Sequence, residues 1–332
     1  MNQFDVIVVG AGPAGLECAR ILQNTPLSVL LLERKQVIGP KPCAGGIVES
    51  VEDFDLPVDR AQAVFEHGFR IGGHTHFLRT RRPVRIVDRW ELGQHQLRPL
   101  KASGNITVLT HTNVRRIDGN CIKTTGGDFF FHYLVGADGA TSLVRRHLRL
   151  ESRYTIGMYY DIPQIRDRLL LVIDGPTLGT GYIWEFPHRT FTNVGIYFDP
   201  FHWRTRQARE ALDAHMNQKR YPMDPKTFRA FPIMYRYQGC KFQDNIFLAG
   251  EAAGLTSKLT GEGISFAIIS GREVARKILN PGYAMNSLKR ILQRKRQQEK
   301  LLALFQKIPL GLNLCYTLSF LAFKHGLTPF KR

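Results

Sequence analysis

The chain has 332 residues, of which 43% carry hydrophobic side chains, and its formal net charge is +18 at pH 7. This length can bury a sizeable core in one large or two interleaved domains, which excludes a small disulfide-held module. The five cysteines are scattered without a CxxC pair or a secretory leader, so we expect a reducing, cytoplasmic compartment and no metal site. No apolar run reaches the length of about 18 residues that predicts a membrane-spanning helix.

The excess of positive charge implies a polyanionic neighbour, which could be nucleic acid, anionic lipid or a phosphorylated substrate. No nucleic-acid-binding motif interleaves with the basic residues, so we expect no nucleic acid partner. Residues 288–300 form a dense basic run at helical spacing, and an apolar stretch follows it. Such a tail is typical of a helix with a solvated face or of a peripheral anchor at the anionic inner face of a membrane.

The chain begins with an apolar strand, a glycine-rich turn and a helix, in the segment FDVIVVGAGPAGLECARILQ. Gly10 permits the tight turn, Gly12 lets the backbone approach a pyrophosphate, and Gly15 lets the helix lie close to the strand. The N–H groups at the helix start carry partial positive charge and attract phosphates. A second strand ends in Glu33, at the spacing of a carboxylate that binds ribose hydroxyls. This unit predicts dinucleotide binding.

Two later segments each place polar residues between a strand and a helix. In YLVGADGATSLVRRHL, Asp138 follows a strand and a helix starts near Ser142. In NIFLAGEAAGLTSKLTGEGISFAIISGREVA, Gly250 and Glu251 follow a strand, and a glycine-rich loop opens a long helix. Each segment alone is an ordinary strand-to-helix turn. Their joint occurrence after the first unit indicates one extended cofactor site.

The three segments together resemble the FAD-binding set of the p-hydroxybenzoate hydroxylase superfamily. Within it the chain is most similar to the geranylgeranyl reductases, flavoproteins that saturate prenyl double bonds. Three motifs carry this resemblance: PKPCAGGI around Cys43, TGEGI at 260–264, and the YxWxFP pattern of residues 182–187 with Asn193 and Gly195 behind it. The resemblance spans about residues 4–279.

The resemblance implies a role for each residue of the FAD site. Glu251 would bind the ribityl or pyrophosphate region, where the family usually has aspartate, and Asp138 would hold the loop beside the pyrophosphate. Arg89 would lie against the flavin, with a solvated helix cap as the alternative. Amides of Gly261, Gly263 and Ile264, at the start of the helix that follows the glycine-rich loop, would face the flavin pyrimidine edge. A positive helix end there would stabilise the reduced ring. The predicted cofactor-binding residues are Gly10, Gly12, Ala14, Gly15, Glu33, Arg34, Cys43, Ala44, Arg89, Asp138, Gly250, Glu251, Gly261, Gly263 and Ile264.

Cys43 is the candidate catalytic residue. Its thiol could orient the alkene or relay a proton at the substrate side of the flavin, and the alternative is a small buried hydrophobe. In the hairpin GYIWEFPHRTFTNVGIYF, strand periodicity puts Tyr182, Trp184 and Phe186 on one face. Taken alone such residues are core filler, but the resemblance makes these three and Gly195 the predicted wall of a substrate pocket.

Two departures from the family bear on that pocket. The family often has a second glycine where this chain has Tyr197, and a larger residue there would reshape the cavity. Lys258 stands where relatives commonly carry proline, and it is one candidate to contact the substrate's head group near the mouth of the pocket.

The predicted activity is FAD-dependent reduction of carbon–carbon double bonds in a prenyl (geranylgeranyl-type) lipid or its diphosphate. Reduced FAD would deliver a hydride to one alkene carbon while a proton reaches the other. No second GxGxxG unit appears, so the electron donor would be NAD(P)H or a small redox protein that docks on the basic surface. The alternative is a flavin-dependent monooxygenase of an apolar or aromatic substrate. A quinone-reducing dehydrogenase would usually need an iron–sulfur cluster, for which no clustered cysteines occur.

We expect an α/β fold in which a Rossmann-like FAD-binding domain carries an inserted antiparallel sheet and a helical C-terminal tail. The predicted FAD domain is discontinuous, over residues 1–65, 85–150 and 240–282. Residues 66–84 and 151–239 would form the substrate-binding sheet, because several apolar strands there are closely spaced. Residues 283–332 would form the basic and apolar tail.

Overall fold

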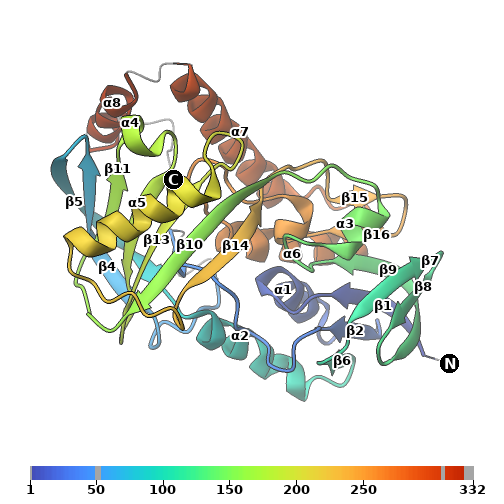
Figure 1. Cartoon of the computed structure of the whole chain (residues 1–332). Coiled ribbons are helices and arrows are strands. Elements are labelled where there is room, and N and C mark those ends of the chain that lie inside the picture. Colours follow the sequence, from blue (N-terminus) through green and yellow to red (C-terminus); the bar gives the residue numbers. More distant parts are fainter. Residues whose placement is uncertain (1, 49–53, 308–310, 325–332) are drawn as a thin grey trace.

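A computed structural model describes residues 2–48, 54–307 and 311–324, and it contains two sheets that lie side by side (Figure 1). The first is a mainly parallel sheet whose strand order is β15-β16-β9-β1-β2-β6. Its central strands are short runs of valine, isoleucine and leucine that are buried on both faces, as parallel sheets require. The strands are β1 (Gln3–Val9), β2 (Val29–Leu32), β6 (Ile106–Leu109), β9 (Gly127–Gly136), β15 (Lys241–Phe242) and β16 (Ile246–Leu248).

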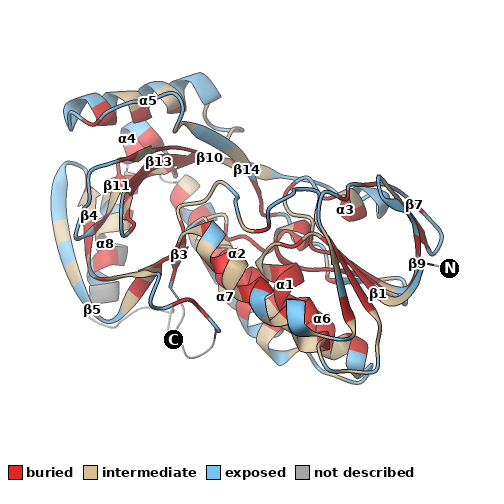
Figure 2. Ribbon diagram, turned by 90° about the horizontal axis from the view of Figure 1, so that it is seen from below, coloured by how far each residue is buried: buried red, intermediate tan, exposed pale blue. Residues whose placement is uncertain are grey.

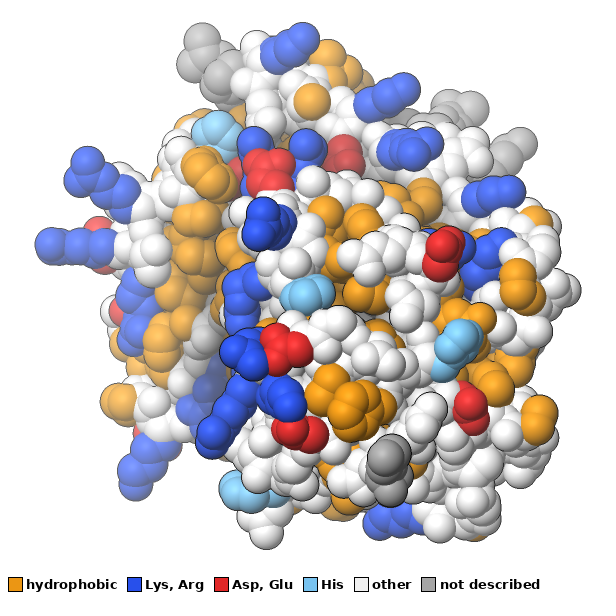
Figure 3. Space-filling model, turned by 90° about the vertical axis from the view of Figure 1, so that its right-hand side faces the viewer, with side chains coloured by type: hydrophobic (Ala, Val, Ile, Leu, Met, Phe, Trp, Pro, Cys, Tyr) orange, Lys and Arg blue, Asp and Glu red, His pale blue; other side chains and the backbone are white. Residues whose placement is uncertain are grey.

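Helices α1 (Pro13–Leu22) and α6 (Ile264–Leu279) pack together on one face of this sheet. The hairpin β7 (Val114–Asp118) and β8 (Cys121–Thr124), together with α3 (Leu143–His147), covers the other face. A Cβ atom at Gly271 would lie 2.1 Å from the Ala14 carbonyl oxygen, so only glycine allows this close approach of α6 to α1. Figure 3 shows the side of the molecule that lies on the right in Figure 1, near β7 and β8, and Lys and Arg side chains gather on part of that surface.

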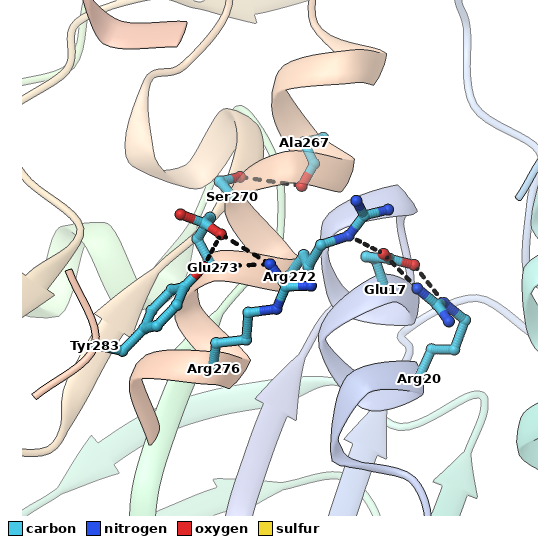
Figure 4. Close-up of polar contacts among 8 residues, drawn as sticks. All are labelled: Glu17, Arg20, Ala267, Ser270, Arg272, Glu273, Arg276 and Tyr283. Atoms are coloured by element: carbon cyan, nitrogen blue, oxygen red, sulfur yellow. Dashed lines mark hydrogen bonds and ion pairs between the residues drawn. The ribbon is translucent and has the colours of Figure 1, made fainter. Parts of the chain in front are cut away.

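A buried carboxylate locks α6 to α1 (Figure 4). Glu17 of α1 accepts hydrogen bonds from Arg20, at 2.7 and 2.8 Å, and from Arg272 of α6, at 2.8 Å. The side chain of Glu17 is almost completely buried, whereas both guanidinium groups reach solvent. Burying a charge is favourable only when it is paired and hydrogen-bonded in this way. The two helices that begin at the glycine loops are therefore held in one arrangement.

The second sheet has the order β14-β10-β13-β12-β11-β4-β5-β3 and is antiparallel except between β11 and β4. Helix α5 (Thr205–Gln218) covers one face of it (Figure 2). The other face packs against the loop before α6 and against α8 (Leu312–Lys324). The strands are β3 (Gly46–Ile47), β4 (Gln62–Ile71), β5 (His74–Ile86), β10 (Tyr154–Ile162), β11 (Leu169–Ile173), β12 (Tyr182–Pro187), β13 (Thr192–Phe198) and β14 (Arg229–Met234).

The expected α/β fold with an antiparallel sheet inserted into a Rossmann-like unit is confirmed. The expected hairpin alternation is also present, since Ile183 and Glu185 point toward α5 while Tyr182, Trp184 and Phe186 share the opposite face. Strand β3 and the start of β4 pair into the second sheet, although the sequence grouped residues 1–65 with the nucleotide unit. The domain boundaries therefore stay a prediction.

The C-terminal part forms α7 (Asn286–Gln306) and α8 (Leu312–Lys324), while residues 308–310 and 325–332 of the predicted tail lie outside the described residues. Glu273 of α6 fixes the start of α7, because its carboxylate accepts hydrogen bonds from the Ser287 and Leu288 N–H groups at 3.0 and 3.3 Å. Within the described ranges no helix is long and apolar enough to cross a membrane. The remaining helices are α2 (Arg89–Leu97), α4 (Gly175–Leu178) and the 3-10 segments Arg98–Ala102 and Gly250–Ala253.

Candidate cofactor and active site

The glycine loop before α1 has the geometry of a phosphate cradle. Gly10 has φ +101°, and a Cβ atom there would lie 2.5 Å from the Ala137 carbonyl oxygen. A Cβ atom at Gly15 would lie 1.9 Å from the Gly10 carbonyl oxygen, whereas one at Gly12 would meet nothing within 4 Å. Gly12 is the N-cap of α1, and no side chain caps that end. The space over Gly12 and the helix N–H groups can therefore receive a phosphate.

Two of the predicted acidic residues hold these loops in place. Glu33 accepts hydrogen bonds from the Ala11 N–H at 3.0 Å and the Lys35 N–H at 2.9 Å, which ties the glycine loop to the end of β2. Asp138 accepts a hydrogen bond from the Leu143 N–H at 2.6 Å and another from the Ser142 hydroxyl, at the start of α3. Burial raises the pKa of Asp138 above its ordinary value. Direct contact of either carboxylate with a cofactor stays a prediction, as does the role of Arg34.

Glu251 joins three segments that are far apart in the sequence. One carboxylate oxygen accepts a hydrogen bond from the Met234 N–H at 3.1 Å, and the other pairs with the Lys41 ammonium group. A Cβ atom at Gly139, which has φ +77°, would lie 3.8 Å from Lys41 Nζ. Gly250 packs against Ala14 close by. Sequence reasoning gave Lys41 no role, although it stands in the PKPCAGGI motif whose spacing could have suggested one.

The start of α6 is the second helix end that is open to a ligand. Its N-cap is Gly263, which has no side chain that could bond the N–H groups that follow. Gly261, just before it, has φ +69°. The hydroxyl of Ser265 in the first turn is buried without a hydrogen-bond partner among the described residues. These groups, with Ile264 at the first helical position, can present donors to an anionic or polar ring edge.

Arg89 is not the solvated helix cap that the alternative interpretation proposed. The cap of α2 is Asp88, whose carboxylate accepts a hydrogen bond from the Trp90 N–H at 2.7 Å. Arg89 is buried, and its Nε atom has no hydrogen-bond partner among the described residues. A buried donor without a partner costs free energy of folding. The Arg89 Nε–H group therefore indicates a ligand that accepts a hydrogen bond from it.

The PKPCAGGI loop lies between the start of α6 and the hairpin. Cys43 packs in the same partly buried cluster as Ile264, and its sulfur accepts a hydrogen bond from the Gly45 N–H at 3.4 Å. A Cβ atom at Gly46 would lie 2.7 Å from the Phe186 ring. His188 bonds the Ala44 carbonyl through Nε2 at 3.1 Å. Burial lowers the pKa of His188 to about 4, so the neutral ring donates this hydrogen bond at pH 7.

In the predicted aromatic wall Trp184 is buried, and the partly buried Tyr182, Phe186 and Ala44 pack against the same cluster. The Trp184 ring lies directly over Gly195, where a Cβ atom would be 2.2 Å from Cζ2, so Gly195 makes room for the indole. The Tyr182 hydroxyl donates to the Thr260 carbonyl at 2.6 Å, which ties the wall to the loop before α6.

Tyr159 of β10 is a site residue that sequence reasoning missed. It belongs to the wall cluster, and its hydroxyl interacts with the backbone of Cys43. Burial raises the pKa of this hydroxyl, so it is protonated at pH 7. Tyr159 pairs with Gly195 across β10 and β13. No local signal marks it in YTIGMYY, because the neighbour that defines its role, Cys43, comes from a loop that is distant in the sequence.

The structure brings some of the predicted residues into contact, since Gly250 packs against Ala14 and Cys43 packs against Ile264, while the cofactor contacts of the full set stay a prediction. The open cradle at Gly12, the two uncapped helix starts, the unpaired Nε of Arg89 and the unpaired hydroxyl of Ser265 together fit FAD, which has two phosphates and a polar ring edge.

Known proteins are similar to this chain over most of its length. The Thi4 family model matches residues 1–51. An uncharacterized protein of Methanosarcina barkeri is 26% identical over 322 residues, which cover 90% of this chain and 80% of that protein. A digeranylgeranylglycerophospholipid reductase of Methanococcus vannielii is 27% identical over 326 residues, which cover 85% and 80%.

A solved structure shows the same fold. It is described as a geranylgeranyl bacteriochlorophyll reductase-like protein of Thermoplasma acidophilum, and it superposes with a TM-score of 0.76 at 20% identity, covering 94% of this chain and 92% of that one. Over most of its length the chain is accordingly similar to geranylgeranyl reductase-like FAD-dependent oxidoreductases, and this similarity implies FAD as its cofactor.

Proposed function

We propose that this protein reduces carbon–carbon double bonds of a prenyl lipid or its diphosphate. The observation that carries the proposal is the apolar wall of Tyr182, Trp184 and Phe186, which packs against the Cys43 loop next to the open start of α6. A prenyl chain offers almost no polar groups, and burying it contributes about 0.8 kcal/mol per methylene. An aromatic face beside the flavin end of the cofactor site is therefore suited to such a chain.

Bound FAD would supply the hydride transfer, and the protein would supply binding, orientation and electrostatics. The amides after Gly12 would hold the phosphates, and Glu251 with Lys41 would lie beside the sugar alcohol. The amides at the start of α6 would stabilise negative charge on the reduced ring, because they are fixed in place before the reaction. The unpaired Nε–H group of Arg89 would donate a hydrogen bond to the same ring.

Cys43 and Tyr159 would act in the step in which the second alkene carbon receives a proton. Cys43 lies beside the start of α6, so its thiol can face a substrate that rests on the wall. The Tyr159 hydroxyl, which keeps its proton at pH 7 because burial raises its pKa, interacts with the Cys43 backbone. We assign Cys43 the orientation of the alkene and Tyr159 the supply of the proton. The reductant would be NAD(P)H or a small redox protein.

The test is an anaerobic titration of the purified flavoprotein. FAD is reduced with dithionite, and geranylgeranyl diphosphate is then added. We expect the oxidised flavin spectrum to return at a rate that depends on substrate concentration, with a saturated product found by mass spectrometry. A flavin that stays reduced with every prenyl compound tried would refute the proposal.

A pair of phenylalanine variants tests the wall. Phe186→Ala removes a wall residue, whereas Phe201→Ala removes an exposed ring on the surface. We expect at least about tenfold slower reoxidation by substrate in the first variant and no change in the second, with FAD retained in both. Rapid NAD(P)H consumption with hydrogen peroxide release and no alkene reduction would favour the monooxygenase alternative instead.

A further inference from the structure

A pocket outside the predicted site lies between α7 and the segment that follows β14. Its volume is about 320 Å³. Tyr235 and Arg236 line it on one side, Lys295 and Arg296 of α7 line it on the other, and Lys258 completes it. Of these side chains the family resemblance pointed only to Lys258.

Positive charge dominates this pocket. Four cationic side chains line it, against the single lining carboxylate of Glu299. Arg236 is exposed and also pairs with Glu151, which does not line the pocket, at 3.2 Å. Arg296 has no hydrogen-bond or ion-pair partner within the described part of the chain. Lys295 is almost fully buried, and its ammonium group donates to the Thr256 carbonyl at 2.8 Å and pairs with Glu299. Burial lowers the pKa of Lys295, and an anion in the pocket would offset that cost.

The two lysines are held over one aromatic ring. Lys258 Nζ lies 5.0 Å and Lys295 Nζ 6.0 Å from the centroid of the Tyr235 ring. Lys258 also pairs with the buried carboxylate of Asp199 at 2.7 Å. Both cations are therefore placed before any ligand arrives, which lowers the entropic cost of binding an anion.

The rest of the pocket is apolar. Leu292, Leu302 and Ala303 of α7 line it beside the charged groups. A site with several cations at one end and leucine side chains at the other suits an amphiphile, with a phosphate group joined to a hydrocarbon. A free nucleotide has phosphate groups but no hydrocarbon chain that would contact the leucine side chains.

Lys258 also connects this pocket with the aromatic wall. Its ammonium group lines the pocket, while its backbone carbonyl accepts a hydrogen bond from the Tyr197 hydroxyl at 2.8 Å. Tyr197 in turn stacks on Tyr182 of the wall, with ring centroids 5.2 Å apart. Tyr197 therefore contacts both Lys258 of the pocket and Tyr182 of the predicted substrate wall.

We propose that this basic pocket binds the phosphate or diphosphate head group of the prenyl substrate. The inference rests on the proposed function for the identity of the hydrocarbon, whereas the anion site stands on the geometry of the pocket. Arg296 and Arg236 supply the exposed cations that meet the head group first, and Lys258 and Lys295 form its floor.

The test is calorimetric titration of the FAD-loaded protein with inorganic pyrophosphate. We expect saturable binding in the wild type and at least tenfold weaker binding in the double variant Arg236→Gln with Arg296→Gln. Arg290→Gln is the matched control, because Arg290 is exposed on the same helix, donates a hydrogen bond to the Ser287 hydroxyl, and does not line the pocket. Absence of pyrophosphate binding, or equal binding in all variants, would overturn the proposal.

Kinetics separate the head group from other phosphates. The double variant is expected to raise the KM for geranylgeranyl diphosphate at least tenfold while leaving kcat, and the reduction of geranylgeraniol, unchanged. If instead the KM for NADPH rises and NADPH displaces pyrophosphate, the pocket serves the reductant and the head-group assignment is wrong. If pyrophosphate binds but no prenyl compound reoxidises the flavin, the proposed reaction fails and the anion site remains.

Discussion

The buried His188 makes the stability of this protein depend on pH in a way that can be measured. The ring is 5% exposed, stacks on Phe191 with a centroid distance of 4.2 Å, and bonds the Ala44 carbonyl. This contact anchors the Cys43 loop to the hairpin. Lowering the pH protonates histidine in the unfolded chain first, because burial holds the neutral form in the folded protein.

The expected size follows from the two pKa values. With about 6.5 for the unfolded chain and about 4 for the folded protein, the free energy of unfolding falls by about 2 kcal/mol at pH 5 and by about 3 kcal/mol well below pH 4. The free energy of unfolding falls as the pH falls, because the pKa of His188 is lower in the folded protein than in the unfolded chain. Above pH 7 both states are neutral and the histidine has no linkage effect.

Urea unfolding at pH 7.5 and pH 5.0 measures the effect in wild type and in His188→Phe. The variant keeps an aromatic ring against Phe191 but cannot titrate, so its loss of stability between the two pH values should be smaller by about 2 kcal/mol. His74→Phe, at an exposed position, is the control and should follow the wild type. An equal loss in wild type and His188→Phe would refute the account of His188 as a buried neutral donor.

Three further substitutions test the site and its supports. Gly12→Ala meets no atom within 4 Å, so the free energy of unfolding should not change, while the Kd for FAD, followed by flavin fluorescence, should rise at least about tenfold; an unchanged Kd would place the phosphates elsewhere. Gly195→Ala forces the Trp184 ring to move and should cost about 1–3 kcal/mol in urea unfolding, against almost nothing for Gly104→Ala, whose added methyl also meets no atom within 4 Å. Glu273→Gln should cost about 1–2 kcal/mol and speed hydrogen exchange at the first turn of α7; unchanged exchange there would contradict its capping role.

The sequence by itself determined the features that depend on local pattern. The spacing of Gly10, Gly12 and Gly15 after a valine-rich strand predicts a tight turn, and in the structure Gly10 has φ +101°, a conformation that favours glycine. The alternation along residues 182–187 placed Tyr182 and its partners on one face, because side chains alternate along any strand. The fold class followed from the order of such units along the chain.

Only the tertiary structure decided which distant residues contact those faces and loops. Asp88 rather than Arg89 caps α2, which leaves Arg89 buried, and burial depends on packing from other parts of the chain. Tyr159 acquires its role through the distant Cys43 backbone, and Lys41 through a pair with Glu251 that is 210 positions away in the sequence. The cations of the basic pocket likewise come from three segments that no local pattern relates. Local sequence fixes backbone conformation and side-chain direction, whereas the neighbours that set charge, burial and chemistry are chosen when distant segments pack together.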